Sequence, residues 1–310
     1  MQDFLLELGF EELPARFVLE ASRQLTAAVV KELKEGRLKH GEVRSFSTPR
    51  RLAVLIRDVV SKQADLIEEI KGPPKSMAYD HRGNLTKAGK GFLRSQGAAQ
   101  ETLEIKEFQG SEYIFIRRET RGEAAVQILK PALEKVIRNL SFPKNMRWGD
   151  YELRYARPLR WIVALFGPET IPVQVGAVNG GRISSGHRQL SPEPIEIKRP
   201  GEYVSLLKEH YVLVDAAERQ NTIWNQIEHL AQKNKGRLRK DKRLLEEVTN
   251  LVEYPTAFCG EFSQDYLEVP AEVLITAMKG HQRYFPLEDE TGELLPKFIG
   301  VRNGADNHLK

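Results

Sequence analysis

The chain has 310 residues, of which 41% are hydrophobic and 29% charged, and this excludes a chain that is disordered throughout. That length is ample for one large or two ordinary domains. A formal net charge of +4 and an isoelectric point of about 9.0 permit an acidic partner such as RNA but do not require one.

The apolar segments are too short for a membrane span. The longest apolar run covers residues 161–166, whereas a spanning helix needs about 20 apolar residues. The N-terminal segment Met1–Phe10 is interrupted by Asp3 and Glu7 and lacks the positive region of a signal peptide. The lone cysteine, Cys259, excludes an intrachain disulfide and suits a reducing compartment. We therefore expect a cytoplasmic protein with no membrane partner.

Hydrophobic periodicity and breaker residues predict the elements of the N-terminal half. Pro14 is expected to open a helix that ends near Glu35, because a proline at the first helical position loses no hydrogen bond. Gly72-Pro73-Pro74 is expected to form a rigid loop outside any element. The predicted strands are 4–8, 52–60 and 113–117, and the predicted helices are 14–35, 86–96 and 123–140.

From Phe142 onward, prolines and glycines punctuate the chain more densely. Asp215 is expected to cap a helix that runs to Lys233, because Glu218 follows it at the spacing of a capping box. The other predicted helices are 202–208, 241–252 and 270–281, and the predicted strands are 161–166, 171–178, 193–198, 256–262, 284–287 and 298–301.

Strands and helices mix without a regular strand–helix–strand rhythm, which indicates an α+β fold. We expect mixed, mostly antiparallel sheets with packed helices. The predicted division is into two subdomains, residues 1–145 and 146–310, because the density of prolines changes near that point.

The sequence contains no recognisable catalytic motif. Gly83–Gly91 looks like a phosphate-binding loop, but its spacing is one residue too long and Gly91 replaces the residue that would hold magnesium. The seven histidines are scattered and no cysteine pair exists, so we expect no metal site. No Gly-x-Ser-x-Gly or His-Glu-x-x-His element occurs. We therefore predict no catalytic residue in this chain.

Two basic stretches are candidates for RNA contact, because arginines contact phosphates and aromatic rings stack on bases. For the first stretch the alternative is a clasp between domains, with Trp148 and Trp161 in the core. For the second stretch the alternative is a solvated loop. The candidate RNA-binding residues are Lys144, Arg147, Arg154 and Arg157 in the first stretch, and Lys235, Arg237, Arg239, Lys240 and Arg243 in the second.

Two histidines stand close to basic residues, His187 next to Arg188 and His281 near Arg283. Such pairs can bind phosphate or serve as acid–base groups. These four residues are therefore candidates for a pocket. In the sequence no carboxylate stands at a spacing from which it could orient either histidine. The alternative is that these four residues have structural or surface roles.

An ordered series of short motifs runs through essentially the whole chain. The main motifs are ELGFEELP from Glu7, TPRRL from Thr48, KGPP from Lys71, FPKNMRWG from Phe142, RPLRW from Arg157, SGHR from Ser185, LVEYP from Leu251 and VLITAMK from Val273. Each motif alone is weak, but together they resemble the N-terminal part of the β subunit of bacterial two-subunit glycyl-tRNA synthetase. One small departure is Gly280, where an acidic residue is expected.

The resemblance implies a subunit of an α2β2 enzyme that joins glycine to its tRNA with ATP. In that family the adenylating site lies on the α subunit, so ATP and magnesium are expected there and no cofactor is expected on this chain. The implied partners are the glycyl-tRNA synthetase α subunit and the tRNA for glycine. The HD-type and anticodon-binding domains of the family are expected to be absent from this chain.

Two other functions remain open on the sequence alone. An editing-type hydrolase acting on mischarged tRNA would need a pocket in which His187 or His281 meets a nearby acid. A pure protein-interaction scaffold would have no RNA contact. A continuous positive face would favour RNA binding, and an exposed apolar patch would favour docking of the α subunit.

Overall fold

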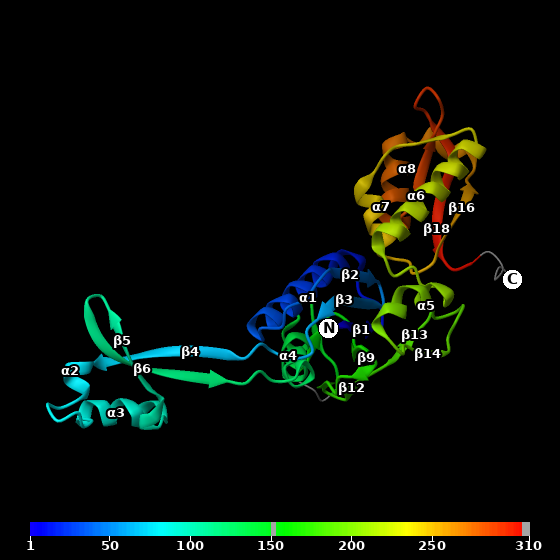
Figure 1. The fold of residues 1–310 in the computed structure, drawn as a ribbon. Coiled ribbons are helices and arrows are strands. Elements are labelled where there is room, and N and C mark those ends of the chain that lie inside the picture. The colour runs from blue at the N-terminus through cyan, green and yellow to red at the C-terminus, as the bar shows by residue number, and fades with distance from the viewer. Residues whose placement is uncertain (150–152, 306–310) are drawn as a thin grey trace. The chain divides into compact units, whose positions relative to one another are not determined.

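The computed structural model describes residues 1–149 and 153–305, and the chain divides into two compact units. Unit 1 consists of Met1–Ser61 and the chain from Val126 onward, and unit 2 is Lys62–Ala125, inserted between them (Figure 1). Helices and mostly antiparallel sheets occur in both units, which confirms the predicted α+β class. None of the helices in the described residues is long and apolar enough to cross a membrane.

Unit 1 contains a seven-stranded sheet with the order β11-β12-β9-β1-β3-β2, in which β10 also pairs with β9. Its pairings are antiparallel except for that of β12 with β9. The long strands are β1 (Gln2–Phe10), β2 (Val43–Thr48), β3 (Arg51–Val59) and β9 (Leu159–Phe166). The short strands are β10 (Glu169–Thr170), β11 (Gln174–Val175) and β12 (Val178–Gly181).

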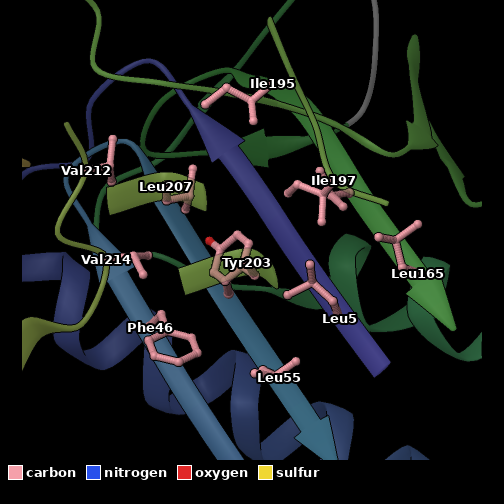
Figure 2. Close-up of a cluster of buried hydrophobic side chains, with 12 residues drawn as sticks. Leu5, Phe46, Leu55, Leu165, Ile195, Ile197, Tyr203, Leu207, Val212 and Val214 are labelled. Atoms are coloured by element: carbon pink, nitrogen blue, oxygen red, sulfur yellow. The ribbon is translucent and has the colours of Figure 1, made fainter. Parts of the chain in front are cut away.

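Both faces of the central strands are covered, which explains why residues 4–10 of β1 are all buried. Helix α1 (Ala15–Glu35) begins directly after Pro14, as predicted, and packs on β2 and β3. Helix α5 (Tyr203–Glu209), preceded by η2 (Pro200–Glu202), covers the other face. Figure 2 shows Tyr203 and Leu207 of α5 directed at the strands that carry Leu5 and Leu55.

Shorter elements surround this sheet. Helix α4 (Ala125–Asn139) lies beside α1, where Lys135 pairs with Glu32 at 2.6 Å. Two small antiparallel ribbons complete this part, β7 (Met146–Arg147) with β8 (Arg154–Tyr155), and β13 (Ile183–Ser185) with β14 (Pro194–Glu196).

The remainder of unit 1 is a four-stranded antiparallel sheet with the order β15-β17-β18-β16. Helix α6 (Ala216–Lys233) packs on β16, and the Asp215 side chain accepts hydrogen bonds from the amides of Ala217 and Glu218, so the predicted cap is confirmed. The strands are β15 (Arg237–Leu238), β16 (Pro255–Glu261), β17 (Phe285–Glu288) and β18 (Leu294–Asn303). The other helical segments are α7 (Lys242–Thr249), η3 (Gln264–Glu268), α8 (Ala271–Ala277) and η4 (Met278–Gln282).

Unit 2 is a three-stranded antiparallel sheet with two helices. Its strands are β4 (Leu66–Pro74), β5 (Leu103–Phe108) and β6 (Ser111–Thr120), in the order β4-β6-β5. Its helical segments are α2 (Lys75–Ala78), α3 (Lys87–Gln96) and η1 (Gln100–Thr102). Thr86 caps the start of α3, and Gly97 ends it in the left-handed conformation, with φ of 61°.

Three sequence predictions differ from the structure. Gly72-Pro73-Pro74 was expected to be a loop but forms the end of β4. Prolines are tolerated there because β4 is an edge strand and its register shifts between Lys71 and Pro74. The strand predicted at 171–178 is broken into β11 and β12, and the helix predicted at 270–281 ends at Ala277 and continues as a π-helical turn.

The compact units do not divide at the predicted boundary between residues 145 and 146. Strand β1 pairs with β9 along Phe4 to Phe10, so residues from both sides of that boundary share one sheet. The segment that separates is the insertion Lys62–Ala125, whose own strands pair with one another.

Gly9 provides the space that the Trp161 indole occupies. In the sheet, Gly9 is flanked by Arg51 of β3 and Trp161 of β9. A Cβ atom on Gly9 would lie 1.9 Å from the Cδ2 atom of Trp161. The indole therefore lies over the bare backbone of Gly9.

We predict that Gly9→Ala lowers the free energy of unfolding by about 1–3 kcal/mol, because the added methyl group would overpack this site. Chemical denaturation followed by circular dichroism would measure the change. Gly181→Ala is the matched control, since a Cβ there meets nothing within 4 Å. Equal shifts in the two variants would contradict the assigned packing of Trp161.

Candidate functional site

Three fully buried charged side chains meet at the centre of unit 1. Arg51 projects from β3 between two carboxylates, Glu7 of β1 and Glu253 of the segment before β16. The Nη1 atom of Arg51 lies 3.5 Å from the Oε2 atom of Glu7, and its Nη2 atom lies 3.1 Å from the Oε1 atom of Glu253. The Nε atom of Arg51 also donates a hydrogen bond of 3.1 Å to Glu253. We call Glu7, Arg51 and Glu253 the buried triad.

Neutral donors satisfy the Glu7 carboxylate of the triad. The Ser184 hydroxyl and the Trp161 indole N–H each donate to its Oε1 atom at 2.5 Å. The Tyr203 hydroxyl donates to its Oε2 atom at 2.5 Å. These donors come from β13, β9 and α5, so one carboxylate connects three separate elements to β1.

The Glu253 carboxylate is contacted by one hydroxyl group and by a second arginine. The Thr48 hydroxyl donates to its Oε1 atom at 2.7 Å, and the guanidinium of Arg50 lies 3.5 Å from its Oε2 atom. The backbone amide of Glu253 donates to Asn303 of β18 at 2.9 Å. Arg50 also donates to the carbonyl of Gly186 at 3.1 Å, which ties the SGHR segment to the triad.

The charges of the triad stabilise one another against burial. Burial alone would raise the pKa of the Glu253 carboxyl, but the positive charges of Arg51 and Arg50 outweigh it and hold that pKa below its ordinary value. Burial would lower the pKa of Arg51, yet Glu253 and Glu7 raise it. Glu253 is therefore ionised at neutral pH and paired with a charged arginine, which gives it no proton to donate to a substrate.

A second buried arginine holds α6 against the sheet. The Arg219 guanidinium donates to the carbonyl oxygens of Thr249, Leu213 and Ser47, at 2.9, 2.5 and 2.8 Å. Burial lowers its pKa to about 10. Sequence reasoning missed this residue, because an arginine within a polar helix is ordinarily an exposed one.

The four pocket candidates lie on two separate parts of unit 1. His187 is buried beside the triad, whereas its neighbour Arg188 is exposed and pairs with Glu11 at 2.6 Å. His281 is exposed on η4, and Arg283 pairs with Glu247 at 2.7 Å. His281 and Arg283 line two different hollows, and the described walls of these two hollows include neither His187 nor Arg188.

Neither histidine is placed as a catalytic base would be. His187 is only 1% exposed, and its Nδ1 atom accepts hydrogen bonds from the amides of Gln189 and Leu190. His281 lines a hollow whose described walls contain no carboxylate. No group of three or more His, Cys, Asp or Glu side chains in residues 1–149 and 153–305 is arranged to hold a metal ion.

The nine candidate RNA-binding side chains are all exposed. Arg147 and Arg154 face each other across the β7–β8 ribbon. Near β15, Arg237 lies 3.8 Å from Glu290 and Arg239 lies 3.2 Å from Glu288. The other five exposed candidates are Lys144, Arg157, Lys235, Lys240 and Arg243.

The two indoles of the first basic stretch are only partly buried, whereas the alternative of a clasp between domains placed both in the core. Trp148 is half-buried and donates from its Nε1 atom to the carbonyl of Tyr155 at 3.1 Å. Trp161 is half-buried as well, with its Nε1 atom on Glu7. Both indoles are nevertheless anchored by a hydrogen bond. Residues 150–152 of this stretch lie outside the described chain.

Comparison with known proteins identifies the family. A sequence model described as "Glycyl-tRNA synthetase beta subunit" matches residues 4–310. The chain belongs to this family. It is 50% identical over 309 residues to the glycine–tRNA ligase beta subunit of Bacillus subtilis and 48% identical over 309 residues to that of Halalkalibacterium halodurans. In both comparisons all of this chain is covered, but only 45% and 44% of the relative, so the chain spans less than half of their length.

The triad brings together motifs through which the chain resembles the glycyl-tRNA synthetase beta subunit family. Glu7 comes from ELGFEELP, Arg51 from TPRRL and Glu253 from LVEYP. His187 of SGHR and Trp161 of RPLRW lie against the same network. These segments are separated by many residues in sequence, so the motifs by themselves did not show that their charged residues form one internal cluster.

His187 is expected to make folding pH-dependent. Burial lowers the pKa of His187 below 6.5, although Asn303 and Glu253 act in the opposite direction. The unfolded chain therefore binds a proton more readily than the folded chain. The stability contributed by neutral His187 is fully present above about pH 6.5 and is lost as the pH falls toward the folded pKa.

We predict that the free energy of unfolding falls between about pH 7.5 and about pH 5.5, and that His187→Gln flattens this slope. Urea denaturation at a series of pH values would measure it. His281→Gln, at an exposed position, is the control and should retain the wild-type slope. A wild-type slope in His187→Gln would show that another group binds the proton.

Proposed function

We propose that this chain is part of an enzyme that ligates glycine to its tRNA, in which it binds tRNA and docks a separate α subunit. Membership of the glycyl-tRNA synthetase beta subunit family supports this proposal. The adenylating site, with its ATP and magnesium, is assigned to the α subunit of a cytoplasmic α2β2 assembly. The triad supports that assignment, because its charged groups are fully buried and held in ion pairs with one another, which leaves them unavailable to a substrate.

The observation that best supports RNA binding is the pairing of Arg147 with Arg154. The two arginines are exposed and lie directly opposite each other in the β7–β8 ribbon. Neither guanidinium makes an ion pair with the described residues. Like charges placed opposite one another destabilise a two-stranded ribbon. A negatively charged phosphate backbone would relieve this repulsion, whereas a protein-interaction scaffold without RNA gives no reason for it.

We predict that Arg147→Ala weakens tRNA binding and leaves the melting temperature nearly unchanged, because removing a like-charge contact costs the fold little. Losing one phosphate contact should reduce the slope of log K against log salt by about 0.9. Titrations of labelled tRNA from about 50 to about 200 mM salt would measure both affinity and slope.

Lys198→Ala is the matched control for Arg147→Ala. It removes one exposed positive charge from unit 1 outside both basic stretches, and it should leave the slope unchanged. An Arg147→Ala slope equal to that of Lys198→Ala would contradict a phosphate contact at the ribbon.

Docking of the α subunit is supported by the apolar surface of unit 2. This inserted unit exposes four large apolar side chains, each between 43% and 60% accessible. Exposed apolar side chains offer surface that a protein partner can bury. The four are Ile67 of β4, Met77 of α2, and Ile105 and Phe108 of β5.

Replacing residues 62–125 with a short glycine–serine linker should abolish capture of the α subunit while unit 1 still unfolds cooperatively. The replacement is feasible because Lys62 and Ala124 form a β-bridge, so the two ends of the unit lie side by side. Copurification with a tagged α subunit and thermal melting would test it. As a control, Ile183→Glu alters an exposed apolar residue of unit 1 and should retain capture. Full capture without unit 2 would refute its docking role.

A further inference from the structure

A turn of π-helix separates two hollows in unit 1. The turn η4 (Met278–Gln282) follows α8 and ends at Arg283, whose φ of 60° is left-handed. Single turns of π-helix are frequent at functional sites. Lys279 and Gly280 of this turn line a hollow of about 690 Å³, and His281 and Gln282 line another of about 470 Å³. We call them the basic hollow and the aromatic hollow.

The basic hollow has an excess of one positive charge, and two of its cations form no ion pair with its carboxylates. Its lining includes four basic side chains and three carboxylates. Lys279 forms an ion pair with Asp241, and Arg283 forms one with Glu247. The remaining cations are Arg16 and Arg243, both exposed, and neither forms an ion pair with the described residues. The third carboxylate, Glu246, is exposed at the rim.

Asn250 is an independent sign that the basic hollow takes a ligand. It lines the hollow and is only 6% exposed. Its side-chain amide makes no hydrogen bond to any residue that the structure describes. Its side-chain polar atoms are not fully enclosed, so they reach the solvent that fills the hollow. The amide can therefore donate to a group in the hollow. Helix α1 begins at Ala15 on the same wall with no side-chain cap, which adds backbone donors for an anion.

The aromatic hollow has the walls of a site for a flat heteroaromatic ring. Tyr284 and Phe298 stack with a centroid distance of 4.3 Å and an interplanar angle of 12°. Tyr266 lines the same hollow, where it meets Phe262 in a T-shaped contact, and it is 58% exposed, which leaves ring surface open to a partner. Gln282 and His281 supply hydrogen-bonding groups on the same lining. Stacking surfaces with a few polar groups bind unpaired nucleobases.

The geometry points to a binding site for an unpaired segment of an RNA strand that crosses the η4 turn, with a phosphate in the basic hollow and a base against Tyr266 in the aromatic hollow. Lys279, Gly280 and Arg283 line one face of the turn, and Ala277, His281 and Gln282 line the other. The phosphate and the base therefore belong to neighbouring nucleotides of the strand. An apolar protein side chain would fill the apolar walls but would leave the guanidinium groups of Arg16 and Arg243 without an anion. This site rests on the proposed RNA binding and names the part of the RNA that it would take.

Fluorescence anisotropy with a short labelled single-stranded RNA, and with a duplex of the same length, would test the site on the 310-residue chain. The single strand should bind more tightly than the duplex. Tyr266→Ala should weaken single-strand binding about tenfold, and Tyr266→Phe, which keeps the ring, should bind like the wild type. Unlabelled adenosine monophosphate, the free-nucleotide arm, should compete only weakly, because it lacks the neighbouring phosphates of a strand.

The phosphate contact has its own matched pair of variants. Arg16→Ala should reduce the salt slope for the single strand by about 0.7. Arg23→Ala removes an exposed arginine two turns further along α1 and should leave the slope unchanged. Thermal melting of each variant would check that it remains folded.

Several outcomes would overturn the site. If tRNA binds in a salt-dependent manner but Tyr266→Ala and Arg16→Ala both behave like the wild type, the nucleotide site is wrong and the proposed function stands. If Tyr266→Ala weakens capture of the α subunit and leaves single-strand RNA binding unchanged, the aromatic hollow is a protein contact. Saturation by adenosine monophosphate without binding of the RNA strand would also refute it. If neither tRNA nor the single strand binds, the RNA-binding part of the proposed function fails as well.

Discussion

The buried ion pairs of Arg51 are the interaction on which the rest of unit 1 depends. Placing charged groups in a protein interior costs several kcal/mol for each ion. This cost is offset only when the charges pair and their remaining atoms are hydrogen-bonded. Arg51 meets Glu7 on one side and Glu253 on the other, and hydroxyl and indole groups saturate the carboxylates. Removing one partner would leave an uncompensated buried charge, at a cost of about 3–5 kcal/mol.

The triad also sets how distant segments are positioned. Its members lie on β1, on β3 and before β16, so the seven-stranded sheet and the four-stranded sheet are joined through one set of charges. Arg219 reinforces the same junction by donating to carbonyls of Ser47 and Thr249. Because polar groups require defined angles and distances, such a junction is more specific than an apolar contact of similar area. A rigid unit 1 can then hold its surface sites in constant positions.

The groups available to partners lie on the surface, outside this network. The β7–β8 ribbon carries opposed arginines, and unit 2 carries exposed apolar side chains. The η4 turn lines one hollow that has basic side chains and another that has aromatic rings. The proposed docking and RNA contacts would then use different elements.

Local features of the sequence determined the class of fold and many of the elements. Pro14 and Asp215 mark helix starts because their effects act within one turn, and the motif series identifies the family. The tertiary structure alone decided which motifs meet. Glu253 follows Arg51 by about 200 positions, and no periodicity or spacing encodes a pairing across such a distance. The tertiary structure likewise decided that β9 pairs with β1, although unit 2 is inserted between them in the sequence. It also decided that His187 is buried while Arg188 is exposed, and that two hollows share η4. These features arise from long-range packing, which sets burial and electrostatic partners and leaves little local signal in the sequence.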